Sequence, residues 1–303
     1  MYKGTDNKSK YLGIIPPLVT PLREDESLDE GSFIKIINHC IDRGVHGVFT
    51  MGTSGEAMCV TNKVWKKAIE ISVREARSRV PVFCGVIDTC TAKVIENIKE
   101  AQQLGAEIVV VTPTFYLQNT CQNEIIRHFE KVCNSTDLEV VVYNIPPMTH
   151  VNILPETIAQ LAQMDNVVAY KDSCGNWEQV QRDLFLLEDS NISFFNGAEE
   201  LCSASMLFGA QGCVPGLANY FPKLFVDLYN AGINRDIELS YELQKQIWDV
   251  RKSLAVGKSW ISAMKYIGCR LKLCADKASS PIEPLSDEDR KTIDGIIEKH
   301  MEK

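Results

Sequence analysis

The chain has 303 residues, of which 45% are hydrophobic and 24% are charged, a balance typical of a soluble globular enzyme. Its formal net charge of −8 and its pI near 5.3 argue against a protein that binds nucleic acid or an anionic membrane surface. No apolar run approaches the roughly 20 residues of a transmembrane helix, and the polar residues 1–11 lack the apolar core of a secretion signal, so we expect a cytoplasmic protein with no membrane partner.

The first half of the chain alternates short apolar runs with longer segments that have apolar residues at helical spacing. The apolar runs predict strands over 13–22, interrupted by prolines, and over 45–51, 82–87 and 108–112. A helix is expected after a cap at Ser27 or Asp29, with Gly44 as its end. Further helices are expected over 61–79, capped by Thr61, and over 91–104 and 122–133.

The same alternation continues to residue 214. Apolar runs predict strands over 139–143, 167–171, 192–196 and 212–214. Helices are expected from Pro155 onwards, over 180–187 and over 200–208. From residue 221 to residue 303 only helical patterns occur, enough for three to four helices.

Eight predicted strands, each followed by a helix, imply an α/β fold with parallel pairing through right-handed crossovers. Eight such units close into a (β/α)8 TIM barrel of about 250 residues, with the active site at the carboxyl ends of the strands. A doubly wound open sheet is the rival fold, but its G-x-G-x-x-G fingerprint is absent. We therefore expect a single domain over 1–303, with the barrel over 11–220 and a C-terminal helical extension over 221–303.

Neither the cysteines nor the histidines are spaced like metal ligands. The eleven cysteines are scattered with no Cys-x-x-Cys pair, as expected of reduced side chains in the cytosol. The histidines lie far apart, at His39, His46, His128, His150 and His300. We therefore expect no metal and disfavour a metal-dependent aldolase. His150 follows the strand that ends near Tyr143, so it is either a substrate contact or a bystander in the loop.

Two of the predicted strands end in residues that suit imine chemistry. The run from Val167 leads into Lys171, and the strand from Glu139 ends at Tyr143. Burying an ammonium is costly unless it is paired or deprotonated, so the alternative is a lysine at the wet end of a strand, paired with Asp172. If the two strands are neighbours, the lysine can act as an amine nucleophile while the tyrosine hydroxyl transfers protons.

A third motif, GTSGE over 52–56, follows the second predicted strand. Its glycines allow tight turns, and its hydroxyl and N–H groups can form a nest for an anion. The alternative is a plain turn in which Thr53 or Ser54 caps the next helix. The spacing differs from the Gly-x-Ser-x-Gly nucleophile elbow, and no Walker loop is present, so neither a serine hydrolase nor a P-loop protein is expected.

These motifs, in this order and with the run YNIP over 143–146, resemble the dihydrodipicolinate synthase/N-acetylneuraminate lyase family. The resemblance covers residues 11–285, including GAQG over 209–212 and PIEPL over 281–285. It implies a barrel with a C-terminal helical extension, assembled as a homotetramer or a dimer. It also implies a lysine imine with pyruvate or another 2-oxo acid, formed without an organic cofactor or a metal.

The resemblance assigns roles to the motif residues. Lys171 would be the imine lysine and Tyr143 the proton shuttle. Thr53 and Ser54 would hold the substrate carboxylate and link the tyrosine to solvent, which makes Ser54 part of the catalytic relay as well. An ordinary lysine carries its proton at neutral pH, so it needs a dry site to become a nucleophile.

The chain departs from the family pattern at two positions. The synthases that make the lysine precursor carry an arginine that binds the carboxylate of aspartate semialdehyde; Met148 stands in that column, and a thioether cannot pair with a carboxylate. A relocated cation, with Arg127 and Arg182 the first candidates, is the alternative. Many members also receive a tyrosine from a neighbouring subunit. That column holds Phe115, so either Tyr116 replaces it through a one-residue shift or the relay is shorter.

The run NGAEE over 196–200 resembles the loop in which sugar-acid lyases bind substrate hydroxyls. By this resemblance Gly197 and Glu199 contact the substrate, and Glu199 accepts hydrogen bonds from a polyol. The alternative for Glu199 is a solvated charge at a helix N-terminus. Val214, at the end of the last predicted strand, is a further expected substrate contact.

Three functions compete. The leading interpretation is an aldolase that cleaves a 2-oxo acid, such as 2-keto-3-deoxygluconate or 4-hydroxy-2-oxoglutarate, to pyruvate or a related oxo acid. The second is dihydrodipicolinate synthase, which condenses pyruvate with aspartate semialdehyde, with altered substrate contacts. The third is a non-catalytic protein that binds a 2-oxo acid, which is disfavoured because a binder has no need of Lys171, Tyr143 and the hydroxyl pair together.

Overall fold

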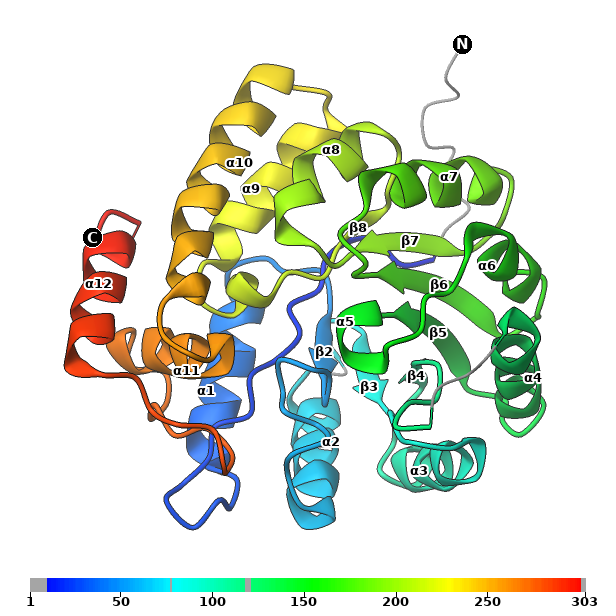
Figure 1. Cartoon of the computed structure of the whole chain (residues 1–303), viewed down its shortest axis with the longest axis horizontal. Coiled ribbons are helices and arrows are strands. Elements are labelled where there is room, and N and C mark those ends of the chain that lie inside the picture. The colour runs from blue at the N-terminus through cyan, green and yellow to red at the C-terminus, as the bar shows by residue number, and fades with distance from the viewer. Residues whose placement is uncertain (1–9, 77, 118–120, 301–303) are drawn as a thin grey trace.

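The structure, a computed structural model, describes residues 10–76, 78–117 and 121–300 (Figure 1). Its eight strands form one sheet: β1 (Gly13–Ile14), β2 (Val48–Thr50), β3 (Val82–Gly85), β4 (Ile108–Val111), β5 (Glu139–Asn144), β6 (Val167–Asp172), β7 (Ser193–Asn196) and β8 (Gly212–Cys213). The helices between them are α1 (Glu30–Ile41), α2 (Asn62–Ala76), α3 (Thr91–Gln103), α4 (Gln122–Cys133), α5 (Pro146–Thr149), α6 (Pro155–Leu161), α7 (Trp177–Leu187) and α8 (Cys202–Leu207). Three 3-10 turns are η1 (Glu199–Leu201), η2 (Gly216–Asn219) and η3 (Lys252–Ala255).

The sheet is parallel throughout, with strand order β1-β8-β7-β6-β5-β4-β3-β2. The two end strands close the barrel through backbone hydrogen bonds of 2.7–3.0 Å, from His46 N to Ile14 O, from Phe49 N to Pro16 O and from Leu18 N to Phe49 O. Prolines lack an N–H donor, so β1 is far shorter than the run predicted over 13–22. The predicted TIM barrel is confirmed.

Two apolar layers follow from the alternation of side chains along each strand. One layer packs between the strands and the surrounding helices. The other fills the barrel with inward-facing side chains: Tyr11, Ile15, Phe49, Phe83, Ile108, Val110, Val141, Tyr143, Ile145, Ala169, Phe195 and Val214. The barrel is therefore a packed core, and a substrate can enter only at one of its ends.

Most helix ends follow the capping residues in the sequence, and a few differ. The Asp29 side chain accepts a hydrogen bond from Ser32 N, so the cap of α1 is Asp29 rather than Ser27. Helix α7 begins at Trp177 after an Asn176 cap, earlier than predicted. The helix predicted over 200–208 is divided into η1 and α8. The short helix α5 was not predicted, because its two prolines indicate a loop unless they stand in the first helical turn.

The helical extension after β8 contains α9 (Pro222–Ile233), α10 (Ile237–Arg251), α11 (Trp260–Arg270) and α12 (Asp287–Ile297), in line with the three to four helices predicted. Helices α9 and α10 pack against α8, and Lys35 of α1 donates a hydrogen bond to Lys272 O, just after the end of α11 (Figure 1). None of the described helices is long and apolar enough to cross a membrane. The extension thus covers one side of the barrel, and the division of the chain at residue 220 stays a prediction.

Candidate active site

Lys171 and Tyr143 are neighbours at the carboxyl ends of β6 and β5. The two residues are partners in the parallel register of these strands, and both side chains are buried. The Lys171 ammonium lies 3.9 Å from the centroid of the Tyr143 ring. A lysine and a tyrosine this close can act on the same substrate atom, one as a nucleophile and the other in proton transfer.

Apolar side chains surround this pair. Lys171 Nζ lies 5.1 Å from the centroid of the Phe49 ring, which also packs edge-on against Tyr143. A void of about 10 Å³, roughly the space of one water molecule, lies among eight residues: Ile15, Phe49, Phe83, Val110, Val141, Lys171, Phe195 and Val214. Val214 was predicted to lie at the site; Phe49 was missed, although the alternation along β2 turns it inward. These apolar side chains keep bulk water away from the Lys171 amine.

Asp172 does not pair with Lys171, so that alternative is wrong. Its Oδ1 accepts hydrogen bonds from Asn144 Nδ2 at 2.8 Å and from Cys174 N at 3.2 Å, while Cys174 Sγ lies 2.8 Å from Oδ2. Burial raises the pKa of this carboxyl above its ordinary value. Among the described residues, no carboxylate lies within 4.0 Å of the Lys171 ammonium. The lysine is therefore available to a ligand.

Gly197 follows β7 and packs directly beside Lys171. A Cβ at this position would lie 2.9 Å from Lys171 Cε and 2.0 Å from Ser173 Oγ. Gly197 N also donates a hydrogen bond to Asp172 O at 2.6 Å. Any larger residue here would collide with the lysine side chain, so the glycine keeps the space around the amine open.

The GTSGE run forms a turn between β2 and α2, and α2 begins only at Asn62. Neither Thr53 nor Ser54 therefore caps a helix, which excludes the alternative considered for these residues. Within the described chain, no acceptor bonds the N–H groups of Thr53 and Ser54, although Ser54 is buried. Two consecutive amides with adjacent hydroxyls form a nest suited to a carboxylate.

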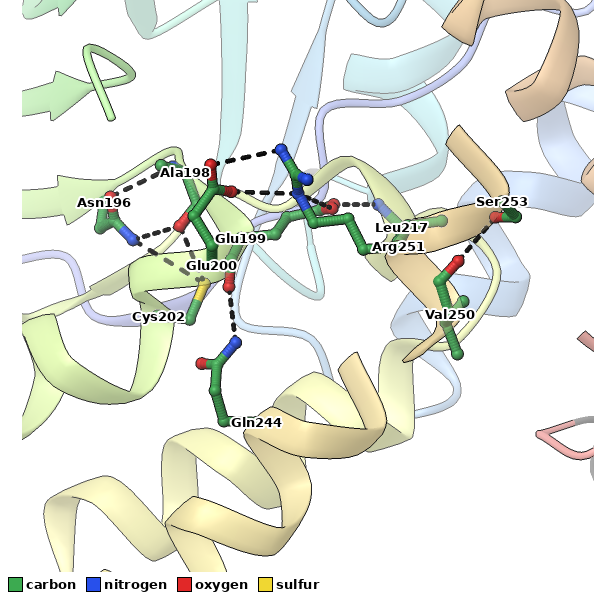
Figure 2. A network of polar contacts seen from close by, with 10 residues as sticks. All are labelled: Asn196, Ala198, Glu199, Glu200, Cys202, Leu217, Gln244, Val250, Arg251 and Ser253. Atoms are coloured by element: carbon green, nitrogen blue, oxygen red, sulfur yellow. Dashed lines mark hydrogen bonds and ion pairs between the residues drawn. The ribbon is translucent and has the colours of Figure 1, made fainter. Parts of the chain in front are cut away.

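Glu199 is buried, with 7% of its surface exposed, so the alternative of a solvated charge is wrong. Its Oε1 accepts a hydrogen bond from Leu217 N at 2.7 Å (Figure 2). Arg251 of α10 lies 3.9 Å from its Oε2 and 3.0 Å from the carboxylate of Glu200, and Gln244 Nε2 donates to Glu199 O at 2.9 Å. Desolvation raises the pKa of Glu199 to about 7, although the Leu217 N–H and Arg251 favour its charged form.

Glu199 and Ser54 face the same space. A Cβ added to Gly216 would lie 3.6 Å from Glu199 Oε1 and 3.6 Å from Ser54 Oγ. The turn after β2 and the turn after β7 therefore meet above η2. Together with the pair at the ends of β5 and β6, they form a site at the carboxyl ends of the strands.

A family model described as the dihydrodipicolinate synthetase family matches residues 10–300. The chain belongs to this family. Members of the dihydrodipicolinate synthetase family are class I aldolases, so the chain is a carbon–carbon lyase.

Individual relatives are similar along nearly the whole chain. The 4-hydroxy-tetrahydrodipicolinate synthase of Methanothrix thermoacetophila is 30% identical over 290 residues, which span 95% of this chain and 97% of the relative. That of Bartonella bacilliformis is 31% identical over 290 residues, spanning 94% and 97%. The solved dihydrodipicolinate synthase of Bacteroides thetaiotaomicron has a TM-score of 0.91 and 33% identity, covering 96% of this chain and 99% of that chain.

Met148 and Tyr116, which are expected from the sequence to depart from the family pattern, lie at the rim of the barrel mouth. Met148 on α5 is 46% exposed, and Tyr116 is 87% exposed with a left-handed backbone, φ 74°. Phe115 is partly buried, while His150 is exposed at the end of α5. The structure therefore does not bring Tyr116 or His150 against the Lys171–Tyr143 pair within one chain.

Arg127 and Arg182 lie on α4 and α7, in the outer layer of helices. The Arg182 guanidinium pairs with Glu156 of α6. Neither arginine is found among the residues that contact Lys171, Tyr143 or Glu199 in the described part of the chain. They are poor candidates for a carboxylate-binding cation in this member of the family.

The described residues contain no group of three or more His, Cys, Asp or Glu side chains placed to hold a metal ion. All the cysteines are free thiols, and several are deeply buried. Burial raises the pKa of the Cys40 and Cys84 thiols to about 12, which makes both poor nucleophiles. Lysine chemistry is thus better supported by the geometry than thiol chemistry.

Proposed function

We propose that the protein is a Schiff-base lyase in which Lys171 forms an imine with a 2-oxo acid. The observation that carries this proposal is the buried Lys171 ammonium 3.9 Å from the Tyr143 ring, with apolar neighbours. The lysine amine attacks the C2 carbonyl, and water leaves to give a protonated imine. This imine withdraws electrons from the bond between C3 and C4, which breaks when Tyr143 accepts the proton of the C4 hydroxyl.

Cleavage releases an aldehyde and leaves an enamine of pyruvate on Lys171. The enamine is protonated at C3, and water then hydrolyses the imine to free pyruvate and restore the amine. Thr53 and Ser54 bind the substrate carboxylate through their unbonded N–H groups and hydroxyls, and the Ser54 hydroxyl links Tyr143 to solvent. The steps need neither a metal nor an organic cofactor, because the imine itself is the electron sink.

The proposed substrate is a hydroxylated 2-oxo acid, such as a 2-keto-3-deoxy sugar acid or a 4-hydroxy-2-oxo acid. Two side chains at the site support this choice. Met148 offers no charge to the acidic group of a second substrate, whereas Glu199 offers a buried acceptor near Ser54 for substrate hydroxyls. Gly197 leaves room beside the amine, and Val214 packs beneath it.

Dihydrodipicolinate synthase activity is the second candidate, favoured by the names of relatives that are 30–31% identical. In that reaction the same pyruvate enamine attacks aspartate semialdehyde. The bond-making and bond-breaking residues are common to both functions, so only the residues that hold the second substrate distinguish them.

We also propose that the protein is cytoplasmic and acts as a homotetramer or a dimer. Tyr116 supports the assembly, because a tyrosine that is 87% exposed on a single chain can reach the site of a neighbouring subunit. In that assembly its hydroxyl would extend the proton relay from Tyr143. A partly buried Phe115 lacks a hydroxyl for this role.

The experiment that tests the proposed function is a screen for pyruvate release. The protein is incubated with a panel of 2-oxo sugar acids and 4-hydroxy-2-oxo acids, and in a parallel arm with pyruvate and aspartate semialdehyde. Pyruvate release from a hydroxylated acid, with slow condensation in the parallel arm, is the expected result. Fast condensation with no cleavage would instead assign the synthase function.

A further inference from the structure

A buried ion pair connects the turn that carries Thr53 and Ser54 to the helical extension. Lys265 on α11 lies 2.6 Å from Oε1 of Glu56, and the two side chains are 0% and 1% exposed. Glu56 is the last residue of the GTSGE run, two positions from Ser54. A fully buried pair of this kind links two segments that are more than 200 residues apart in the sequence.

Each partner of the pair binds a further segment of backbone. The other carboxylate oxygen of Glu56 accepts hydrogen bonds from Ser279 N and Ser279 Oγ, both at 2.7 Å. Lys265 Nζ donates to Thr20 O, and Thr20 Oγ1 donates to Gly55 O at 2.7 Å. Three segments therefore converge on the turn: the loop after β1, helix α11 and the loop before α12.

The turn that these contacts hold has a strained backbone. Met51 and Glu56, which flank the GTSG residues, have left-handed φ angles of 56° and 55°. Such conformations are unfavourable for residues other than glycine and persist only when the surroundings enforce them. Gly55 is packed as closely as its backbone allows, since a Cβ there would lie 2.9 Å from Leu18 O. The shape of the turn is thus imposed by its contacts.

Stability alone does not account for an ion pair at this position. Desolvating two charges is costly, and well-packed apolar side chains often replace such a pair without loss of stability. What these contacts add is direction, because the two Ser279 donors at one carboxylate oxygen and the Lys265 ammonium at the other leave Glu56 a single orientation. Here that orientation determines where the amides of Thr53 and Ser54 point.

We propose that Glu56 and Lys265 are positioning residues that hold the Thr53–Ser54 turn in the geometry that binds the substrate carboxylate. By this proposal the helical extension contributes to the geometry of the active site as well as packing against the barrel. This inference rests on the proposed function of the turn. It places the determinants of pyruvate binding on α11, remote in sequence from every motif of the barrel.

The test compares four variants with the wild type: Lys265→Met, Glu56→Gln, the double variant, and Asp294→Asn as a control. Asp294 of α12 accepts a 2.5 Å hydrogen bond from Arg270, which lies on α11 as Lys265 does. The control therefore weakens a different ion pair of α11, one that does not contact the Thr53–Ser54 turn. For each protein we would measure Tm and the pyruvate concentration that gives half-maximal borohydride trapping on Lys171.

The double variant separates positioning from stability. Each single variant leaves one uncompensated buried charge, so both lose thermal stability, and one or both can fail to fold. The double variant removes both charges and recovers much of the Tm. The half-maximal pyruvate concentration should nevertheless stay about 10- to 100-fold above the wild-type value, because the turn has lost its directional contacts. Asp294→Asn should lower Tm and leave this concentration unchanged.

Three results would overturn the inference. A double variant that binds pyruvate as the wild type does would show that the pair is structural only. If Asp294→Asn weakens trapping as much as the double variant at equal Tm, the effect comes from general destabilisation. If the double variant fails to fold while Lys265→Met binds pyruvate normally, the ion pair is not needed for binding. Failure of the wild type itself to trap pyruvate would instead refute the proposed function.

Discussion

Side chains on the strands at the barrel mouth and side chains on the segments that surround the mouth differ in their burial. Lys171 and Tyr143 project from central strands, are buried and touch each other. Met148 and Tyr116 lie in short segments after β5 and β4 and are 46% and 87% exposed. Under the proposed mechanism, residues that form the imine belong to the sheet, and residues that select the second substrate belong to segments that can vary without disturbing the core.

Among the substitutions that leave Lys171 in place, replacing Tyr143 by Phe should have the largest effect. Removing the hydroxyl eliminates proton transfer, so kcat for pyruvate release should fall by about 10²- to 10⁴-fold. The imine should still form on Lys171, more slowly. Tyr170→Phe is the matched control, because Tyr170 is the adjacent buried tyrosine of β6 and faces the helix layer. Equal losses in both variants would contradict a catalytic role for Tyr143.

Met148→Arg tests whether the rim sets the choice of substrate. A charge-assisted contact to a carboxylate contributes about 1.5–3 kcal/mol, so the ratio of kcat/KM for aspartate semialdehyde over a neutral hydroxylated substrate should rise about 10- to 150-fold. Met148→Leu, which keeps the volume without adding charge, should leave the ratio unchanged. A wild type that already condenses aspartate semialdehyde at a biosynthetic rate would make this interpretation of Met148 wrong.

Glu199 connects the rim to the interior, and its burial predicts a pH dependence of stability. Its pKa rises from 4.5 to about 7 on folding because the carboxyl is desolvated. Between these values the folded state keeps a proton on Glu199 that the unfolded state has lost, so the contribution of Glu199 to the free energy of unfolding should fall as pH rises through this window and then level off. The fall is on the order of 3–4 kcal/mol at most, since one pKa unit corresponds to roughly 1.4 kcal/mol.

Glu199→Gln should remove the contribution of Glu199 to the pH dependence of the free energy of unfolding, while its amide oxygen can still accept the hydrogen bond from Leu217 N. The measurement is denaturant unfolding at several pH values from 4.5 to 8, with each variant compared with the wild type. Glu200→Gln is the control, because Glu200 pairs with the same Arg251 but is 32% exposed. Desolvation also raises the pKa of Asp183, to about 8, and lowers that of His128, to about 4, so both variants should keep a pH dependence from these two groups. Identical pH profiles for wild type and Glu199→Gln would contradict the prediction.

Removing metal ions should have the smallest effect. Because the imine is the electron sink, prolonged treatment with EDTA should leave kcat and KM for pyruvate release unchanged. Activity is assayed after the chelator is removed by dialysis, with and without added divalent cations. Loss of activity that a divalent ion restores would require a metal site that the described residues do not show.

The sequence was sufficient to predict the barrel and the Lys171–Tyr143 pair at the carboxyl ends of its strands. Apolar runs that end in Tyr143 and Lys171 are local signals, and parallel strands that follow each other along the chain are adjacent in a barrel. The β1 run was overestimated because the prolines at 16 and 17 fit an apolar pattern and yet cannot donate to a ladder.

The parts that the sequence could not supply depend on distant segments. The burial of Glu199 comes from Arg251 and Gln244 of α10, and a charged residue at the start of a helix otherwise indicates a solvated site. The partner of Glu56 lies on α11, in a segment with no motif of its own. No local pattern indicates such contacts, because they arise only when the extension packs on the barrel.

The most direct test of the central claim is borohydride trapping with pyruvate, followed by intact mass measurement and peptide mapping. The account predicts one reduced pyruvate adduct per chain, located on Lys171 and absent from Lys171→Ala. Lys265, the other buried lysine among the described residues, should remain unlabelled because it is paired with Glu56. An adduct on Lys265 or any other lysine, or no adduct in a preparation that releases pyruvate from substrate, would contradict the imine mechanism.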